Sequence, residues 1–397
     1  MDSRGGIYLI AEFGRELEIG GEVLVSEGLT SDVLIAAYDA DGTFRWVLQL
    51  SSPGADLAND ITYSADADLI YASAHCGSAS DDFGGAVVPE ASPVLFAIRP
   101  DGAIAWSRLG TGSSSLGTSG GAVVLIDGST IRAISAEAET LWTTTLSDGV
   151  SIQDTDSTTS HHYFVGRATE DTVNLGLGDH VRHPSSGRDM FVLRTTLDGT
   201  PDREYWSDIR GSSVLERMAV RPDGSVAVVL RQVGLADYGT GEVIGDTQSM
   251  ALVGLDASLT AVDARIIVGD ARPLAIATTS AGVIRIAGGF FGSVNFGSGT
   301  RSAVGIARSG SGMPPFYAFI ADFESDLRPR EDQVLAPSGP GLDCDAEACG
   351  SVASAMAVGP ADSTVVGGHF FPSIDLGSGT RFSAPEDEDG FVLRLAN

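Results

Sequence analysis

The sequence predicts one all-β domain over residues 1–397, a β-propeller of seven four-stranded antiparallel blades, with six or eight blades as the alternatives. Three observations support this fold. Runs of β-branched and aromatic residues recur along the whole chain, no segment keeps a helical period, and a Gly-containing marker returns about every 60 residues. The 50 glycines suit many tight turns between short strands.

The marker consists of an acidic residue or Asn, an apolar residue and then Gly, usually with a second Gly close behind. The first glycines of its six copies are Gly20, Gly84, Gly176, Gly239, Gly297 and Gly377. One β-rich run precedes each marker and another follows it, as in Val283-Ile-Arg-Ile-Ala before Gly297 and Phe316-Tyr-Ala-Phe-Ile after it. Each marker therefore indicates a long connection between two strands of one repeat.

A turn and a third recurrent strand complete the pattern. Asp-Gly pairs, which favour tight hairpins because such turns need positive φ, precede Trp strands at Asp41-Gly42, Asp101-Gly102 and Asp198-Gly199. The long interval between Gly84 and Gly176 holds a trimmed unit at residues 121–147, which brings the count to seven. We expect the first blade to lack its innermost strand and the last blade its outermost one.

The repeat resembles the bacterial β-propeller repeats of the SBBP type, found in secreted and surface proteins. The resemblance rests on Gly-Gly-Phe-Phe-Gly-Ser at 288–293, Asn295-Phe-Gly-Ser-Gly-Thr, and the Asp-Gly-x-x-x-Trp turns. The short unit at 121–147 instead resembles a pyrroloquinoline-quinone-type propeller repeat. The resemblance implies seven blades and a location in the cell envelope or outside the cell, although no signal peptide precedes the first strand. It implies no defined enzymatic activity.

The charge balance argues against several partners. The formal net charge is −29, and all 24 basic residues are Arg. A surface this acidic repels nucleic-acid phosphates and anionic lipid. We therefore expect no nucleic-acid partner. No window approaches 18 uninterrupted apolar residues, so we expect no membrane span. The remaining partner classes are proteins and carbohydrates.

Polar residues of the markers are the candidate binding residues: Asp82, Asn174, Asp237, Asn295 and Asp375. In a propeller the connections between second and third strands return to one face, which would set these side chains around a rim, where loops commonly carry function. The alternative is structural, because Asp and Asn side chains also accept hydrogen bonds from their own turns.

Two acidic segments are candidate calcium sites, since hard cations prefer oxygen ligands. They contain Asp343, Asp345 and Glu347 in one loop, and Asp387 and Asp389 in the other. Solvated loops would have the same composition. Cys344 and Cys349 bracket the first segment, and a disulfide between them would indicate an oxidising compartment. A metal site there is the weaker interpretation, and Cys76 is expected to be an ordinary buried thiol.

No catalytic constellation is evident in the sequence. The six histidines are scattered, and no Gly-x-Ser-x-Gly elbow is present. We therefore expect a non-enzymatic, secreted or cell-surface binding or scaffold module, with calcium as the only candidate cofactor. A carbohydrate-active enzyme with acidic residues on the top face is the alternative, and a structural spacer is a third reading.

Overall fold

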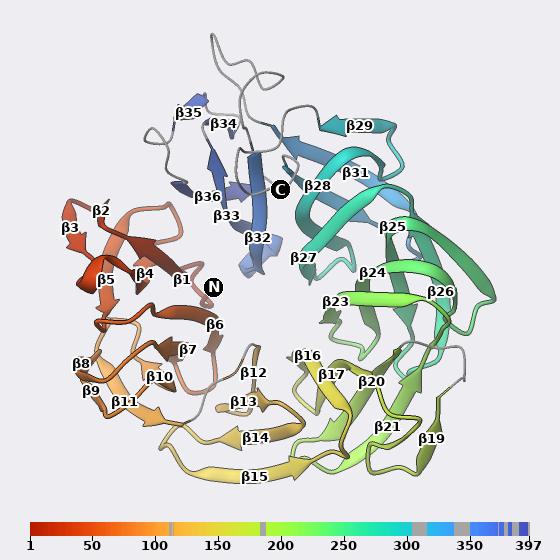
Figure 1. Ribbon diagram of the computed structural model, residues 1–397, viewed down its shortest axis with the longest axis horizontal. Helices are drawn as coiled ribbons and strands as arrows, with labels where there is room; N and C mark the ends of the chain where they lie inside the picture. The colour runs from red at the N-terminus through yellow and green to blue at the C-terminus, as the bar shows by residue number, and fades with distance from the viewer. Residues whose placement is uncertain are drawn as a thin grey trace. The chain divides into compact units, whose positions relative to one another are not determined.

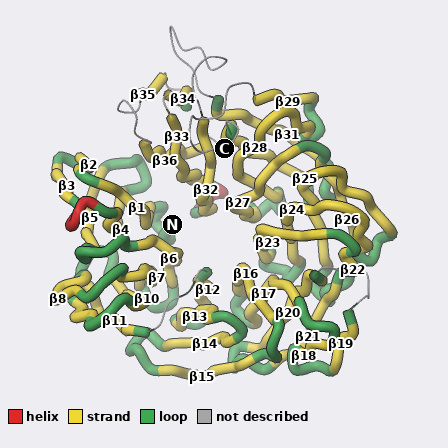
Figure 2. Tube along the Cα trace, in the orientation of Figure 1, coloured by secondary structure: helices red, strands yellow, loops and turns green. Residues whose placement is uncertain are grey.

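The computed structural model describes residues 1–110, 113, 115–182, 188–303, 316–336, 350–371, 373–376, 380–382 and 389–395 (Figure 1). Strands and loops make up these ranges almost entirely (Figure 2). Their helical segments are two 3-10 turns, η1 (Glu27–Leu29) and η2 (Pro360–Asp362). The lack of a helical period in the sequence agrees with this part of the chain.

Contacts divide the chain into two compact units. Unit 1 comprises Met1–Phe164, Asn174–Gly178 and Leu193–Asp202, and unit 2 comprises Val165–Val173, Asp179–Val192 and Arg203–Asn397. The division passes through one sheet, and each unit is described by itself below. The prediction of a single domain over residues 1–397 stays a prediction.

Unit 1 contains three sheets made of strands that follow one another along the chain. The first is β1 (Ile7–Gly14), β4 (Ser31–Tyr38) and β5 (Phe44–Leu50). The second is β6 (Leu57–Ser64), β7 (Leu69–Cys76), β10 (Ser92–Ile98) and β11 (Ile104–Leu109). The third is β12 (Leu116–Ser119), β13 (Ala122–Asp127), β14 (Thr130–Ile134) and β15 (Thr140–Thr145). The strand β6 also contacts both β1 and β12.

A fourth sheet has residues in both units. It consists of β16 (Val150–Ser157), β17 (His161–Ala168), β20 (Asp189–Thr196) and β21 (Pro201–Trp206).

Unit 2 contains three further sheets. The first is β22 (Asp208–Ile209), β23 (Ser212–Val220), β24 (Val226–Asp237), β25 (Glu242–Leu255) and β26 (Ala261–Ile267). The next is β27 (Asp270–Thr278), β28 (Ile284–Asn295), β29 (Thr300–Ala303), β30 (Tyr317–Phe323) and β31 (Pro329–Leu335). The last is β32 (Gly350–Val358), β33 (Thr364–Phe371) and β36 (Asp389–Leu395). The first strands of these sheets contact one another, β23 with β27 and β27 with β32.

Four two-stranded hairpins lie in connections within their sheets, between the first and second strands of the sheet β1-β4-β5 and between the second and third strands of the other three sheets. They are β2 (Glu16–Ile19) with β3 (Glu22–Val25), β8 (Ser80–Phe83) with β9 (Ala86–Val88), β18 (Thr172–Asn174) with β19 (Asp179–Val181), and β34 (Ser373–Asp375) with β35 (Thr380–Phe382). In unit 2 the extensions of β24 into β25 and of β28 into β29 take the same place. We call these six elements the Gly-marked hairpins.

The prediction of seven four-stranded blades is wrong. Only three of the main sheets have four strands, two have five, and the sheets β1-β4-β5 and β32-β33-β36 have three, so the described residues form fewer than seven complete blades. The prediction divided the chain into seven repeats of equal strand content, whereas the sheets differ in their number of strands. The first sheet lacks an innermost strand, the last lacks an outermost one, and long central strands add a fifth partner in two others. The coarser prediction of an all-β propeller is supported, because successive antiparallel sheets of sequence-adjacent strands are its topology.

Tryptophans join each sheet of unit 1 to the next one along the chain. The indole N–H groups donate to backbone carbonyls of the following sheet, Trp46 to Pro100 at 2.9 Å, Trp106 to Ala136 at 2.7 Å and Trp142 to Leu197 at 2.8 Å. Each acceptor lies in the turn before the outermost strand of its sheet. A Cβ on Gly102 would lie 3.0 Å from Trp46, and one on Gly199 would lie 2.4 Å from Trp142. The Asp-Gly turns therefore reverse the chain between two strands and also leave room for the indole of the preceding sheet.

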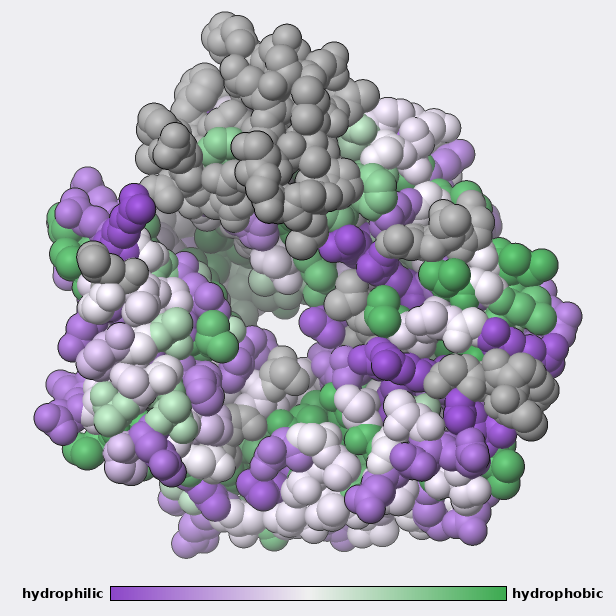
Figure 3. Space-filling model, in the orientation of Figure 1, coloured by the Kyte–Doolittle hydropathy of each residue, from purple (hydrophilic) through white to green (hydrophobic). Residues whose placement is uncertain are grey.

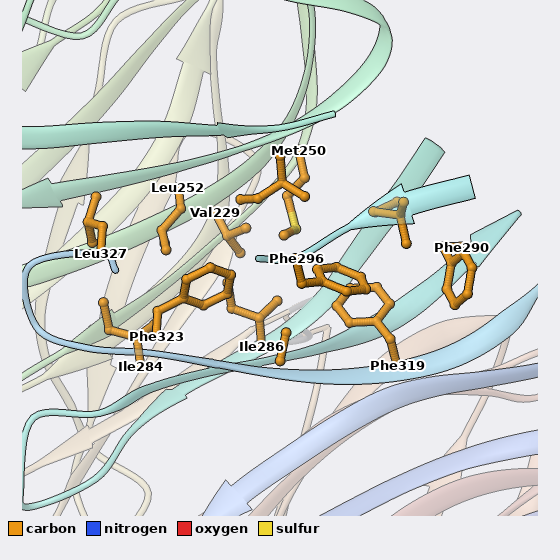
Figure 4. Close-up of a cluster of buried hydrophobic side chains, with 14 of the residues drawn as sticks. Val229, Met250, Leu252, Ile284, Ile286, Phe290, Phe296, Phe319, Phe323 and Leu327 are labelled. Carbon is orange, nitrogen blue, oxygen red and sulfur yellow. The ribbon is translucent and has the colours of Figure 1, made fainter. Parts of the chain in front are cut away.

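Aromatic and aliphatic side chains fill the space between the sheets of unit 2. One cluster joins Val229 and Leu252, on β24 and β25, to Ile286 and Phe319, on β28 and β30. Figure 4 shows the rings of Phe296 and Phe319 side by side in this cluster, with centroids 4.5 Å apart. Because Phe296 belongs to a marker, the marker contributes directly to the core.

Candidate binding site on the Gly-marked hairpins

In four of the six markers the polar residue accepts a hydrogen bond inside its own turn. These bonds run to Asp82 from the Gly85 N–H (2.6 Å), to Asn174 from Gly176 (2.7 Å), to Asp237 from Gly239 (2.7 Å) and to Asn295 from Gly297 (2.8 Å). Asp375 is exposed at the end of β34, and Gly377 lies outside the described residues. These are the bonds expected for the structural interpretation of the marker. A binding role for the five residues stays a prediction.

The apolar residue of the marker anchors the hairpin. Phe83, Leu175, Tyr238 and Phe296 are all fully or almost fully buried. The Tyr238 hydroxyl donates to the Gln232 side chain at 2.8 Å, so even its polar end is satisfied. Burial of one large side chain contributes roughly 2 kcal/mol, which is enough to hold a short hairpin against its sheet.

The hairpins fold back along their own sheets. A Cβ on Gly20 would lie 2.2 Å from Phe44, the first residue of β5, and one on Gly297 would lie 2.2 Å from Pro329, the first residue of β31. Phe44 pairs with Tyr38 at the end of β4, and Pro329 pairs with Phe323 at the end of β30. Each outermost strand therefore starts at the end of its neighbour that is farther from the base of the hairpin. The sequence placed the marker residues around a rim of strand ends, whereas these two turns lie beside the sheets. The prediction of a rim assumed that each loop remains at the end of its two strands and does not fold back along the sheet.

Aliphatic side chains gather on the outward faces of the hairpins. The described residues include 14 exposed large hydrophobic side chains, and seven of these lie on the Gly-marked hairpins: Val23, Val25, Val87, Leu177, Val181, Val233 and Ile244. Their exposed fractions reach 64% at Val87 and 73% at Ile244. Figure 3 shows apolar atoms among hydrophilic ones at the outer edge of unit 2, over β25. Single exposed apolar residues are ordinary, but their recurrence on four of the six Gly-marked hairpins is not.

Carboxylates accompany these aliphatic groups. In the hairpin β2-β3, Glu16 pairs with Val25 and Glu18 with Val23, so each exposed valine has a glutamate directly across the ladder. All four residues are exposed. The outward face therefore combines apolar contact area with negative charge, which suits a partner that offers apolar and basic groups.

The remaining predicted site residues fall mostly outside the described part of the chain. Asp343, Asp345, Glu347, Asp387, Cys344 and Cys349 all lie there, so the calcium sites and the disulfide stay predictions. Asp389 begins β36 and pairs with Phe370 of β33. Among the residues that the structure describes, no group of three His, Cys, Asp or Glu could hold a metal ion. Cys76 is buried and free, its thiol donates to the Ser78 carbonyl at 3.0 Å, and burial raises its pKa.

Sequence reasoning missed the exposed aliphatic groups. The available signal was Glu22-Val-Leu-Val25, in which apolar residues occupy both faces of a short strand. A strand with one solvated face should alternate apolar and polar residues. Departure from alternation beside a marker would have pointed to an outward apolar face.

Comparisons with known proteins find only distant likenesses to solved structures. No family model matches the chain, and no curated protein matches it either. Among solved structures, the chain is similar to the WD40 domain of Neurospora crassa Pan2, with 9% identity, coverage of 92% of this chain and 93% of that one, and a TM-score of 0.45. It is also similar to an apocarotenoid oxygenase of Synechocystis (11% identity, 99% and 93% coverage, TM-score 0.44) and to the N-terminal domain of Nup159 (10%, 92% and 94%, 0.41). Likenesses this distant indicate no shared activity. None of the helices in the described residues is long and apolar enough to cross a membrane.

Proposed function

We propose that this chain is a non-enzymatic binding module that takes a protein partner on the outward faces of its Gly-marked hairpins. The observation that supports this role is the recurrence of exposed aliphatic side chains on those hairpins. A secreted or cell-surface setting accords with the acidic composition and with the repeat that the sequence resembles.

A protein suits these faces better than a carbohydrate does. The exposed large hydrophobic residues among the described positions are Val, Leu and Ile, which give apolar area without directional polar groups. Protein interfaces bury an apolar centre within a polar rim, and the glutamates opposite Val23 and Val25 would form such a rim. The excess of acidic residues further favours a basic partner, whose association it would accelerate.

A carbohydrate-active enzyme gains no specific support from the described residues. Glycoside hydrolysis requires two carboxyl groups at a fixed separation across the substrate. The marker carboxylates of Asp82 and Asp237 accept hydrogen bonds from glycine N–H groups of their own turns.

Random peptides displayed on phage and selected against the immobilised chain would test the proposed role, with a sugar array probed in parallel. We expect enriched peptides that combine Arg or Lys with Leu, Ile or Phe. The double substitution Val23→Thr, Val25→Thr keeps β-branched shapes and should weaken a peptide that uses this hairpin by about tenfold, through lost apolar contact.

Val262→Thr is the matched control, because Val262 is 60% exposed on β26 and lies outside the hairpins. This control should bind like the parent chain. Sugar binding without peptide enrichment, or peptide binding that no hairpin substitution weakens, would contradict the proposal.

A further inference from the structure

Two arginines and one aspartate meet where two neighbouring sheets of unit 2 are in contact. Arg231 lies on β24, and Asp270 and Arg272 open β27. The Arg231 Nη2 atom is 3.3 Å from an Asp270 carboxylate oxygen. The two side chains are 14% and 11% exposed, so the pair is largely but not completely removed from water.

The hydrogen-bonding capacity of this cluster is not satisfied. The Nε atoms of Arg231 and Arg272 are both buried and have no hydrogen-bond partner in the described structure. A guanidinium carries five N–H donors, and the Asp270 carboxylate bonds only to Arg231. A buried donor without an acceptor is destabilising, and a charged donor is more so.

The charges show the same imbalance. Desolvation, followed by repulsion from Arg231, lowers the pKa of Arg272, and desolvation also raises the pKa of Asp270 despite both neighbouring arginines. Two guanidinium groups face one carboxylate, which leaves a local excess of positive charge in a chain whose formal net charge is −29. An additional anion would relieve both the repulsion and the unmet donors.

An aromatic floor orients one of the guanidinium groups. The Arg272 Cζ atom lies 4.3 Å from the centroid of the Phe316 ring, and Phe291 packs edge-on against Phe316 with centroids 5.7 Å apart. Gly289, which pairs with Arg272, lies beside the same ring, and a Cβ at this position would be 3.4 Å from the Phe316 side chain, in van der Waals contact. The ring covers one face of the guanidinium, so a ligand would be recognised at the in-plane N–H edge.

We propose that Arg231 and Arg272 form a binding site for a small oxyanion, of the carboxylate or phosphate type. The fork of N–H groups on a guanidinium matches two oxygens of such a group. Asp270 is the internal competitor of the ligand, because it is already bonded to Arg231. It therefore lowers the affinity of the site and selects against weakly charged anions.

Isothermal titration of the full chain with inorganic phosphate and, separately, with acetate tests this site. Sodium chloride at matched ionic strength is the reference for both anions. Arg272→Gln should weaken binding at least about tenfold, through loss of one charged hydrogen-bonding group. Arg328→Gln is the matched control, because Arg328 is 74% exposed in the same unit and pairs with Asp326. It should bind like the parent chain.

Asp270→Asn distinguishes a binding site from a purely structural ion pair. Removal of the competing charge should tighten phosphate or acetate binding by about tenfold. A gain in affinity cannot result from a damaged fold, so this variant remains informative if Arg272→Gln is unstable. Binding no stronger than that of chloride would overturn the proposal, and so would weaker binding by Asp270→Asn. Preference for phosphate or for acetate would identify the class of anion.

Discussion

Replacement of Gly199 by Ala tests how the sheets of unit 1 are joined. Gly199 has φ 81° in an Asp-Gly turn, and an added Cβ would lie 2.4 Å from the Trp142 ring. The new methyl group would displace an indole whose N–H donates to the Leu197 carbonyl at 2.8 Å. The substitution therefore strains the backbone and also opens the contact between two sheets.

The two contributions can be separated by a matched glycine. Gly85 has the same φ of 81°, and nothing lies within 4 Å of its hypothetical Cβ. Gly85→Ala should cost about 1–2 kcal/mol, from the left-handed backbone alone. Gly199→Ala adds the loss of one hydrogen bond and of part of the ring contact, about 2 kcal/mol together, for a total of roughly 3–4 kcal/mol.

Urea denaturation followed by circular dichroism measures both variants against the parent chain. The double variant Trp142→Ala, Gly199→Ala completes a thermodynamic cycle, in which Gly199→Ala should cost only as much as Gly85→Ala once the ring is absent. Equal destabilisation by Gly199→Ala and Gly85→Ala in the presence of Trp142 would refute the reasoning. The Asp-Gly-x-x-x-Trp motif would then be a turn signal without a role between sheets.

Three further predictions concern the core, pH and calcium. Phe296→Ala should destabilise the chain by about 3–5 kcal/mol in urea denaturation, because it empties a fully buried site beside Phe319. Burial lowers the pKa of His162 to about 4, so the unfolded chain binds this proton before the folded chain does as the pH falls. The free energy of unfolding should therefore be constant above pH 6.5 and decrease by on the order of 3 kcal/mol towards pH 4. Denaturation measured across that range should show a weaker pH dependence for His162→Asn. Calcium should raise the melting temperature if the acidic segments around Asp345 and Asp387 bind it, and a melting temperature unchanged by calcium and by chelator would remove that hypothesis.

The sequence predicted the local features of the fold well. Runs of β-branched and aromatic residues located the strands, and Asp-Gly pairs located turns at Gly42, Gly102 and Gly199, all of which have positive φ. The missing innermost strand of the first sheet and the missing outermost strand of the last were also expected correctly. These features depend on residues close together in the chain, whose conformational preferences act over a few positions.

Features that depend on distant residues were not predictable in this way. The return of each hairpin along its sheet is set by contacts such as Gly297 with Pro329, which two strands, β29 and β30, separate in the sequence. The number of strands in a sheet depends on how far β24 and β28 continue into their hairpins, and no marker records that length. Arg231 and Arg272 belong to different sheets, so only the packing of unit 2 could bring them together.

The first strands of four sheets share one backbone feature but differ in the side chain that stands beside it. Each of these strands has a bulge that begins one residue after a fixed ladder position. That position is occupied by Leu57 in β6, Ser213 in β23, Arg272 in β27 and Val352 in β32. The backbone thus recurs while the side chain changes from apolar to hydroxyl to cation. Folding alone does not require a partly desolvated guanidinium at this ladder position, because the other three strands have other side chains there. Binding chemistry in this chain should therefore be sought where a copy departs from the others, at Arg272 and on the valine-bearing hairpins, and not in the marker residues that every copy shares.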